Sequence, residues 1–513
     1  MVPIRRILFA SMLVMSVPTS GAYSHTFKLS GDQFLLDGRP FQIISGGMHF
    51  ARIPRQYWKA RLKMAKAMGL NTVCTYVFWN LEEPEKGRFN FAENADVPEF
   101  VRMAQEERLW VIIRSSAYAC AEWEFGGYPY WLLKEKNVKV RSHDPEFLEL
   151  MKAYYEQLGK NLAPLQITHG GPISMVQIEN EYGSYGDDKE YLKINERMMR
   201  DVGFDVPLYT LDGIDMVSRG CVEGALPSVD GSTNVQLIEN AVKKDSYGHG
   251  PFFVGEWYPG WFDDWGKPFR TVPVKDCEEQ LDTFLANGLS VNMYMAHGGT
   301  TRAFMNGANF SDDNPCSPQI SSHDYDAPID EAGNPTPKFY ALRDVIRKYL
   351  PADSVLPNVL AAEPTIIIPK FRLDYSIDII HILPKPIYSI DPPTFDGINQ
   401  AYGYVLYRTK IKGRLEGKVD IVHLRDYGIV FVNGKRVAVL DRRLGQETCE
   451  MSLPDSENTL DIFVENLGRI NYGKYINENH KRITGEVLLN GKRITGWNIY
   501  GFPLTKSRKS LRS

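Results

Sequence analysis

The segment GGPISMVQIENEYGSY, residues 170–185, combines a short apolar run with an abruptly polar end. Apolar residues dominate positions 172–178, and Glu179, Asn180 and Glu181 follow at once. A short apolar run of this kind predicts a strand that is buried on both faces, as strands of parallel sheets are. Two carboxyls and an amide directly after it predict that this end of the strand opens into a polar pocket.

Seven further runs of the same kind lie along the chain up to residue 299, and amphipathic helical patterns separate most of them. The eight predicted strands occupy residues 41–50, 71–79, 109–118, 172–182, 206–213, 225–232, 251–258 and 289–299. The clearest predicted helices occupy residues 57–68, 97–107, 145–160, 188–202, 275–287 and 337–349. Eight strand and helix units in about 300 residues predict an α/β fold, a (β/α)8 TIM barrel. An open doubly wound sheet is the alternative, but no GxGxxG follows the first strand to favour it.

The pattern changes after about residue 350. Proline-rich connections give way to strands of period two, and the Asn433-Gly434 and Asn490-Gly491 pairs each lie between apolar runs, where they predict tight hairpins. These features predict a C-terminal antiparallel β-sandwich, jelly-roll-like domain. The predicted domains are a barrel at 25–350, a linker at 351–397, a β-sandwich at 398–504 and a disordered basic tail at 505–513.

The N-terminus has the pattern of a signal peptide. Arg5 and Arg6 precede an apolar run from Ile7 to Val17, and small residues follow, which predicts a leader over residues 1–24 and an exported protein, periplasmic or secreted. No later apolar run is long enough to predict a membrane span. With 59 basic and 63 acidic residues the net charge is −4, which argues against a nucleic-acid partner. The histidines and six cysteines show no metal-ligand spacing, so we expect neither a metal nor a cofactor.

Acidic and aromatic residues gather at the ends of the predicted strands, where the active site of such a barrel lies. Six of the nine tryptophans fall in or just after strand ends. Aromatic faces suit the apolar face of a sugar, and opposed carboxylates suit cleavage of a glycosidic bond. A single glutamate at a strand end is more often a salt-bridge partner than a catalyst, so at most two of these carboxylates are expected to do the bond chemistry.

Six motifs resemble the signatures of glycoside hydrolase family 35, the retaining β-galactosidases. They are TYVFWN, CAEWEFGGYPYWLL, GGPISMVQIENEYGSY, GEWYPGWFDDWG, YMAHGGTTRAFMNGAN and DYDAPIDEAGNPTPKFYALRDVI. The resemblance covers residues 30–350 and continues through LDIFVENLGRINYG in the β domain. It implies a retaining exo-β-galactosidase that acts on oligo- or polysaccharides. Another exo-β-glycosidase, such as a β-glucosaminidase, and a carbohydrate-binding barrel without catalysis are the alternatives.

By position, the resemblance makes Glu181 the general acid/base and Glu256 the nucleophile. The substrate-binding residues that it implies are Tyr76, Ala121, Glu122, Asn180, Tyr258, Tyr294 and Tyr325. It also implies a disulfide between Cys120 and Cys221, with Cys74 a buried free thiol. Strand alternation puts Glu179 on the face of Glu181 but deeper, so we expect Glu179 to support the site without taking part in the chemistry. The leaving-group preference and the quaternary state stay open, and a homo-oligomer is compatible with the sequence.

Overall fold

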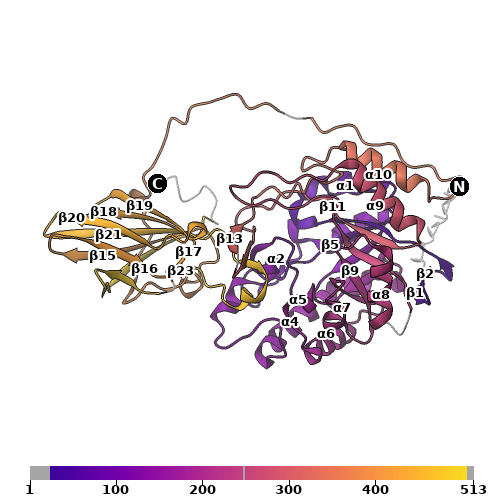
Figure 1. Ribbon diagram of the computed structural model, residues 1–513, viewed down its shortest axis with the longest axis horizontal. Helices are drawn as coiled ribbons and strands as arrows, with labels where there is room; N and C mark the ends of the chain where they lie inside the picture. The colour runs from indigo at the N-terminus through magenta and orange to yellow at the C-terminus, as the bar shows by residue number, and fades with distance from the viewer. Residues whose placement is uncertain (1–23, 246–248, 313, 365, 484, 505–513) are drawn as a thin grey trace, which may run out of the picture.

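The computed structural model describes residues 24–245, 249–312, 314–364, 366–483 and 485–504 (Figure 1). The predicted signal peptide, apart from Ser24, and the predicted tail at 505–513 lie outside the described residues. A barrel with surrounding helices forms one end of the molecule and a β-sandwich forms the other (Figure 1).

Eight parallel strands close the barrel in the order β10-β11-β4-β5-β6-β7-β8-β9. The strands are β4 (Ile44–Met48), β5 (Thr72–Tyr76), β6 (Trp110–Arg114), β7 (Ile173–Gln177), β8 (Leu208–Gly213), β9 (Ala225–Asp230), β10 (Phe253–Trp257) and β11 (Ser290–His297). Each of the eight predicted strands contains one of them, which confirms the (β/α)8 barrel. Strand β7 is shorter than predicted, because the chain leaves the sheet after Gln177 and starts a short helix, α5 (Tyr182–Tyr185).

Helices cover the outside of the barrel. The long ones are α1 (Trp58–Met68), α3 (Val97–Glu106), α4 (Pro145–Leu162), α6 (Lys189–Asp201), α8 (Val235–Asp245), α9 (Val274–Ala286) and α10 (Pro337–Arg347). Helices α3, α4 and α6 each start at an aspartate that caps the first turn. In α4, the Asp144 carboxylate accepts a hydrogen bond from the Phe147 amide at 2.8 Å, and Pro145 begins the helix. Helix α8 was not predicted. A short N-terminal hairpin, β1 (Phe27–Ser30) and β2 (Gln33–Leu36), was also missed.

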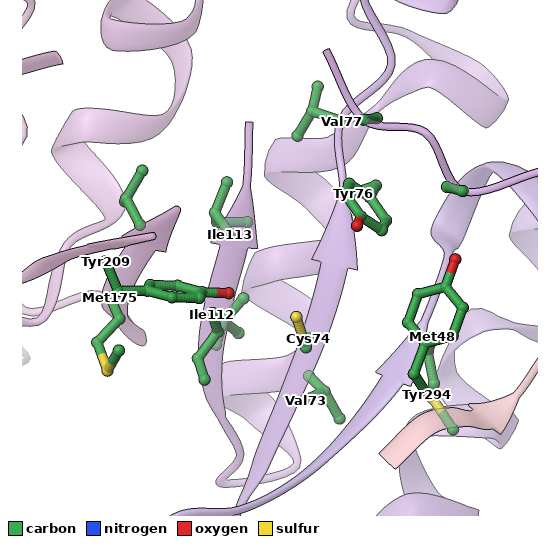
Figure 2. Close-up of a cluster of buried hydrophobic side chains, with 14 of the residues drawn as sticks. Met48, Val73, Cys74, Tyr76, Val77, Ile112, Ile113, Met175, Tyr209 and Tyr294 are labelled. Atoms are coloured by element: carbon green, nitrogen blue, oxygen red, sulfur yellow. The ribbon is translucent and has the colours of Figure 1, made fainter. Parts of the chain in front are cut away.

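The barrel interior is a packed core. Figure 2 shows part of it, with Met48, Cys74, Ile112 and Tyr209 contributed by four different strands. Each of these side chains is almost inaccessible to solvent. Closely packed protein interiors leave little room for rearrangement, so the strand ends above the core form a rigid base for the side chains that lie there.

The C-terminal domain is a two-sheet antiparallel sandwich, as predicted. One sheet has the order β14-β26-β15-β21-β18-β19 and the other β20-β16-β24-β25. The first comprises β14 (Ile387–Ser389), β26 (Trp497–Phe502), β15 (Tyr404–Lys412), β21 (Glu457–Glu465), β18 (Tyr427–Val432) and β19 (Lys435–Asp441). The second comprises β20 (Thr448–Leu453), β16 (Leu415–Ile421), β24 (Val487–Leu489) and β25 (Lys492–Arg493). Asn433-Gly434 and Asn490-Gly491 make the predicted hairpin turns, with positive φ at all four residues.

Two connections join the domains. Residues 351–364 and 366–386 run as a largely irregular, exposed segment from α10 to the sandwich (Figure 1). A three-stranded sheet, β13-β12-β22, links them directly: β12 (Ala308–Ser311) and β13 (Asn314–Pro318) follow the last barrel strand, and β22 (Ile470–Tyr472) comes from the C-terminal domain. Beside this sheet, the buried side chains of Arg469 and Glu124 form an ion pair. The sandwich is therefore bound to the mouth of the barrel by backbone pairing and by buried charge.

Candidate active site

A cavity of about 190 Å³ opens at the carboxyl ends of the barrel strands. Its lining residues are Tyr76, Cys120, Ala121, Glu122, Asn180, Glu181, Glu256, Tyr258, Trp261, Phe262, Tyr294, Asn309, Tyr325, Asn471 and Tyr472. The structure thus brings together all nine residues that the sequence predicted as catalytic or substrate-binding. The volume is below the roughly 300–1,000 Å³ of common ligand pockets, which fits a site for one small ring.

Glu256, on β10, has three partners that stabilise its negative charge. Arg114 forms a buried ion pair with it at 2.6 Å from Nη1 to Oε1. The hydroxyl of Tyr258 donates to Oε2 at 2.8 Å, and the hydroxyl of Tyr76 donates to Oε1 at 3.2 Å. Since hydrogen bonds to a charged group are stronger than those between neutral groups, these three contacts hold the carboxylate in a fixed orientation.

Asn180 is fixed by the same arginine. Its side-chain oxygen accepts hydrogen bonds from Arg114 and from Gln177 Nε2, the second at 3.0 Å. With its oxygen occupied in this way, the amide NH2 group points to Glu181 and donates to Oε2 at 3.2 Å. Arg114 therefore connects the two carboxylates, since it pairs with Glu256 and orients the amide that contacts Glu181.

Glu181 has the opposite environment. Burial raises its pKa well above the usual range, and the nearby carboxylates of Asp230 and Glu256 raise it further, while Arg141 opposes them. Its backbone adopts a left-handed conformation with φ 47°, and its amide donates to the carbonyl of Leu211 at 2.9 Å. A buried carboxyl with a raised pKa stays protonated at pH values where an exposed one is ionised, so Glu181 can donate a proton.

Glu122 also lines the cavity, in a loop of three consecutive left-handed residues, Cys120, Ala121 and Glu122. Burial raises its pKa to about 7, although the nearby Arg52 lowers it. The Tyr294 hydroxyl donates to its Oε2 at 3.2 Å, and His323 Nε2 lies 2.9 Å from the same oxygen. Residues in such backbone conformations persist only where their surroundings hold them, and this loop holds a carboxyl against the cavity.

Glu179 does not line the cavity. Its carboxylate forms a buried ion pair with Arg141 at 2.8 Å and accepts a hydrogen bond from the Tyr191 hydroxyl at 2.7 Å. The expectation that it shares a face with Glu181 was wrong, because both residues have positive φ and strand alternation ends at Gln177. Arg141 also donates to the carbonyl of Asn180, so Glu179 supports the loop from behind.

The tryptophans are mostly structural. Of the six at strand ends, only Trp261 lines the cavity, where it packs edge-on against Tyr258 with ring centroids 4.8 Å apart. Trp123 stacks on Phe78 at 4.1 Å, below the surface. Their number at the strand ends was therefore a poor guide to sugar binding, because four of them belong to the buried core.

Several site residues were missed. The sequence contained a feature that could have identified Arg114: it is a charged residue directly after the apolar run WVII. A charge buried at such a position needs a partner. Asn471 and Tyr472 had no such feature in the sequence: they reach the cavity on β22 of the C-terminal domain, and only the tertiary structure brings this strand there.

The implied disulfide is absent. Among the described residues all six cysteines are free thiols. Cys120 lines the active-site cavity and its sulfur accepts from Asn471 Nδ2 at 3.6 Å, whereas Cys221 lies at the end of a short helix, with its carbonyl bonded to Lys189. The two residues line separate cavities, so the pairing of Cys120 with Cys221 was wrong. Cys74 is a buried thiol, as expected.

No group of three or more His, Cys, Asp or Glu side chains in the described ranges is arranged to hold a metal ion. Within the same ranges, no helix has the length and apolar character needed to cross a bilayer.

A barrel with two carboxyls of contrasting environment in one small pocket defines a glycoside hydrolase. The model for glycosyl hydrolases family 35 matches residues 33–349, and the model for the first all-beta domain of beta-galactosidase matches residues 392–505. The chain belongs to glycosyl hydrolase family 35.

Its relatives span nearly the whole chain. A beta-galactosidase of Xanthomonas manihotis is 43% identical over 506 residues, which cover 96% of this chain and 83% of the relative. A beta-galactosidase of Mus musculus is 40% identical, with 93% of this chain and 75% of the relative covered. One from Bos taurus is 39% identical, with 94% and 75% covered.

Proposed function

We propose that this glycoside hydrolase is a retaining exo-β-galactosidase, with Glu181 as general acid/base and Glu256 as nucleophile. The observation that carries the proposal is the contrast between the two carboxyls. Glu256 is paired with Arg114 and two tyrosine hydroxyls, whereas burial and two neighbouring carboxylates raise the pKa of Glu181. The choice of galactoside is supported by the relatives that are named beta-galactosidases.

In the first step, Glu256 attacks the anomeric carbon while Glu181 donates its proton to the leaving oxygen, so that the glycosidic bond breaks and a glycosyl-enzyme ester forms. Esterification removes the negative charge of Glu256 and with it one cause of the raised pKa of Glu181. Glu181 then accepts a proton from water, which attacks the anomeric carbon and releases Glu256. Retaining enzymes hold the two carboxyls only about 5–5.5 Å apart.

The remaining polar groups of the cavity orient the sugar ring in this proposal. Asn180 already contacts Glu181 and the arginine that pairs with Glu256, and it suits a hydroxyl beside the anomeric centre. Glu122 and Tyr294 are hydrogen-bonded to each other, and within the described residues Glu122 forms no hydrogen bond to either catalytic carboxyl, so this pair suits hydroxyls away from that centre. Tyr325 and Ala121 also line the cavity.

We further propose that residues 1–24 direct export, so that the enzyme acts in the periplasm or outside the cell on oligo- or polysaccharide galactosides. Mass spectrometry of the secreted or periplasmic protein would give the mature N-terminus. Light scattering would decide between a monomer and a homo-oligomer.

The test has two parts. Nitrophenyl β-galactoside should be hydrolysed faster than the β-glucoside and the β-glucosaminide, and a reversed order would contradict the choice of sugar. In the presence of azide, the Glu181→Ala variant should turn the substrate into β-galactosyl azide, because azide attacks the glycosyl-enzyme. The Glu256→Ala variant should turn it into α-galactosyl azide, because azide attacks the substrate directly. Exchanged products would mean that the two roles are reversed.

A further inference from the structure

The proposed galactose contacts occupy one arc of the barrel mouth. Going round the barrel, the arc β10-β11-β4-β5-β6-β7 runs from Glu256 on β10 to Glu181 just after β7. Tyr76 lies on β5, Glu122 lies in the loop that follows β6, and Tyr294 lies on β11. All three are therefore on this arc. The remaining strands, β8 and β9, close the circle between the two catalytic carboxyls. The second arc is therefore the part of the barrel mouth that joins the two catalytic carboxyls and holds none of the proposed galactose contacts.

A separate hollow of about 460 Å³ lies on this second arc. It is lined by residues 213–216, at and after the end of β8, and by residues 230–234, at and after the end of β9. Both segments are at the carboxyl ends of their strands, so the hollow opens on the same face of the barrel as the active-site cavity.

The walls of the hollow touch both catalytic segments. On one side, the Gly231 amide donates to the Glu256 carbonyl at 3.2 Å, and a Cβ on Gly231 would lie 3.6 Å from the Tyr258 ring. On the other side, the Met216 carbonyl would lie 2.3 Å from a Cβ on Gly183, two residues after Glu181. The hollow is therefore next to the nucleophile and next to the proton donor.

The lining has unused hydrogen-bonding groups. Asp215 and Thr233 are exposed, and neither side chain forms a hydrogen bond to another described residue. Asp230 lines the hollow and pairs in register with Glu256, and one of its oxygens is buried without a partner in the described structure. Carboxylates accept hydrogen bonds from sugar hydroxyls and repel an anionic sugar.

We propose that this hollow binds the leaving group of the substrate, and that it takes a neutral sugar whose hydroxyls are bound by Asp215 and Thr233. This inference rests on the proposed function. In the forward reaction the bond between the anomeric carbon and the leaving oxygen breaks, and Glu181 gives that oxygen its proton. In the reverse sense, a sugar in the hollow attacks the glycosyl-enzyme through a hydroxyl oxygen, Glu181 takes the hydroxyl proton, and the ester bond to Glu256 breaks.

The test compares substrates with and without a leaving sugar. For the enzyme and for the double variant Asp215→Ala/Thr233→Ala, kcat/KM is measured on galactosyl-glucose disaccharides that differ in linkage and on methyl β-galactoside. We expect the ratio of the best disaccharide to the methyl galactoside to fall about ten- to hundredfold, as the loss of hydrogen bonds to a charged group would cause. Asp201→Ala, an exposed carboxylate at the end of α6, is the matched control and should keep the ratio of the unmodified enzyme.

A second readout uses the glycosyl-enzyme itself. With nitrophenyl β-galactoside as donor and glucose as acceptor, the double variant should form less galactosyl-glucose per galactose released. An unchanged kcat/KM ratio together with an unchanged transfer ratio would overturn the leaving-group site alone. No cleavage of any galactoside by the unmodified enzyme would overturn the proposed function and this inference with it.

Discussion

Replacing Arg469 by Met should loosen the C-terminal domain from the barrel. The guanidinium is fully buried and pairs with Glu124, whose other oxygen accepts the Arg469 amide at 2.6 Å; the same guanidinium donates to the Ala401 carbonyl at 2.9 Å. The variant leaves the Glu124 carboxylate buried with only the amide as a partner at this contact. Removing one partner of a buried ion pair costs about 3–5 kcal/mol.

The assay is urea unfolding followed by tryptophan fluorescence, together with kcat/KM on a nitrophenyl galactoside. Because the chain has two domains, the transition that moves is the one that separates the sandwich from the barrel mouth. Activity should fall in the same urea range, since Asn471 and Tyr472 line the cavity. Lys59→Met, which breaks the exposed pair of Lys59 with Glu106, is the control and should leave the transition in place.

The double variant Glu124→Gln/Arg469→Met decides the cause. If the loss comes from an unpaired buried charge, the double variant should recover a large part of it, because no charge is then left unpaired. A loss below about 1 kcal/mol in the single variant would refute the reasoning, since it is well under the range for a broken buried pair. So would a double variant that loses the sum of both single changes.

Three further outcomes are expected. The logarithm of kcat/KM should fall as the pH rises through the raised pKa of Glu181, because only the protonated form is an acid. Asp230→Asn should move this falling part of the pH profile to lower pH, since it removes a charge that raises that pKa. A falling part that stays in place would contradict this role of Asp230. Glu179→Gln should lower thermal stability, by about 3–5 kcal/mol for a broken buried pair with Arg141, and the folded fraction should keep most of its kcat, in contrast to Glu181→Gln. Tyr258→Phe should lower kcat/KM about ten- to hundredfold through the lost hydrogen bond to Glu256, and an unchanged value would reduce Tyr258 to a packing residue.

The sequence predicted the barrel because its parallel strands are buried on both faces and therefore read as compact apolar runs. It could not predict where β7 ends: Glu179 and Glu181 continue the strand pattern in the sequence, but their left-handed backbone takes them off the sheet. Helix α8 was missed because its buried residues, such as Ile238 and Val242, are few.

The predicted catalytic and binding residues gathered in one cavity because they follow strands whose ends must meet. Arg114 and the ion pair of Glu179 depend on which buried charges face each other, and Tyr472 depends on how the second domain docks. Neither the pairing of buried charges nor the docking of a domain can be read from a single sequence motif. The disulfide failed for the same reason, since Cys120 and Cys221 line separate cavities.

Strand β22 also constrains when the enzyme becomes active during synthesis. The hydrogen bonds that join Arg469 to Glu124 and Asn471 to Cys120 connect positions 345 and 351 residues apart. Domains generally fold as units, the N-terminal one first, so the barrel can close while the last wall of its pocket is still within the ribosome. A newly made chain would then carry both catalytic carboxyls in a folded barrel and gain its full binding site only when the sandwich docks.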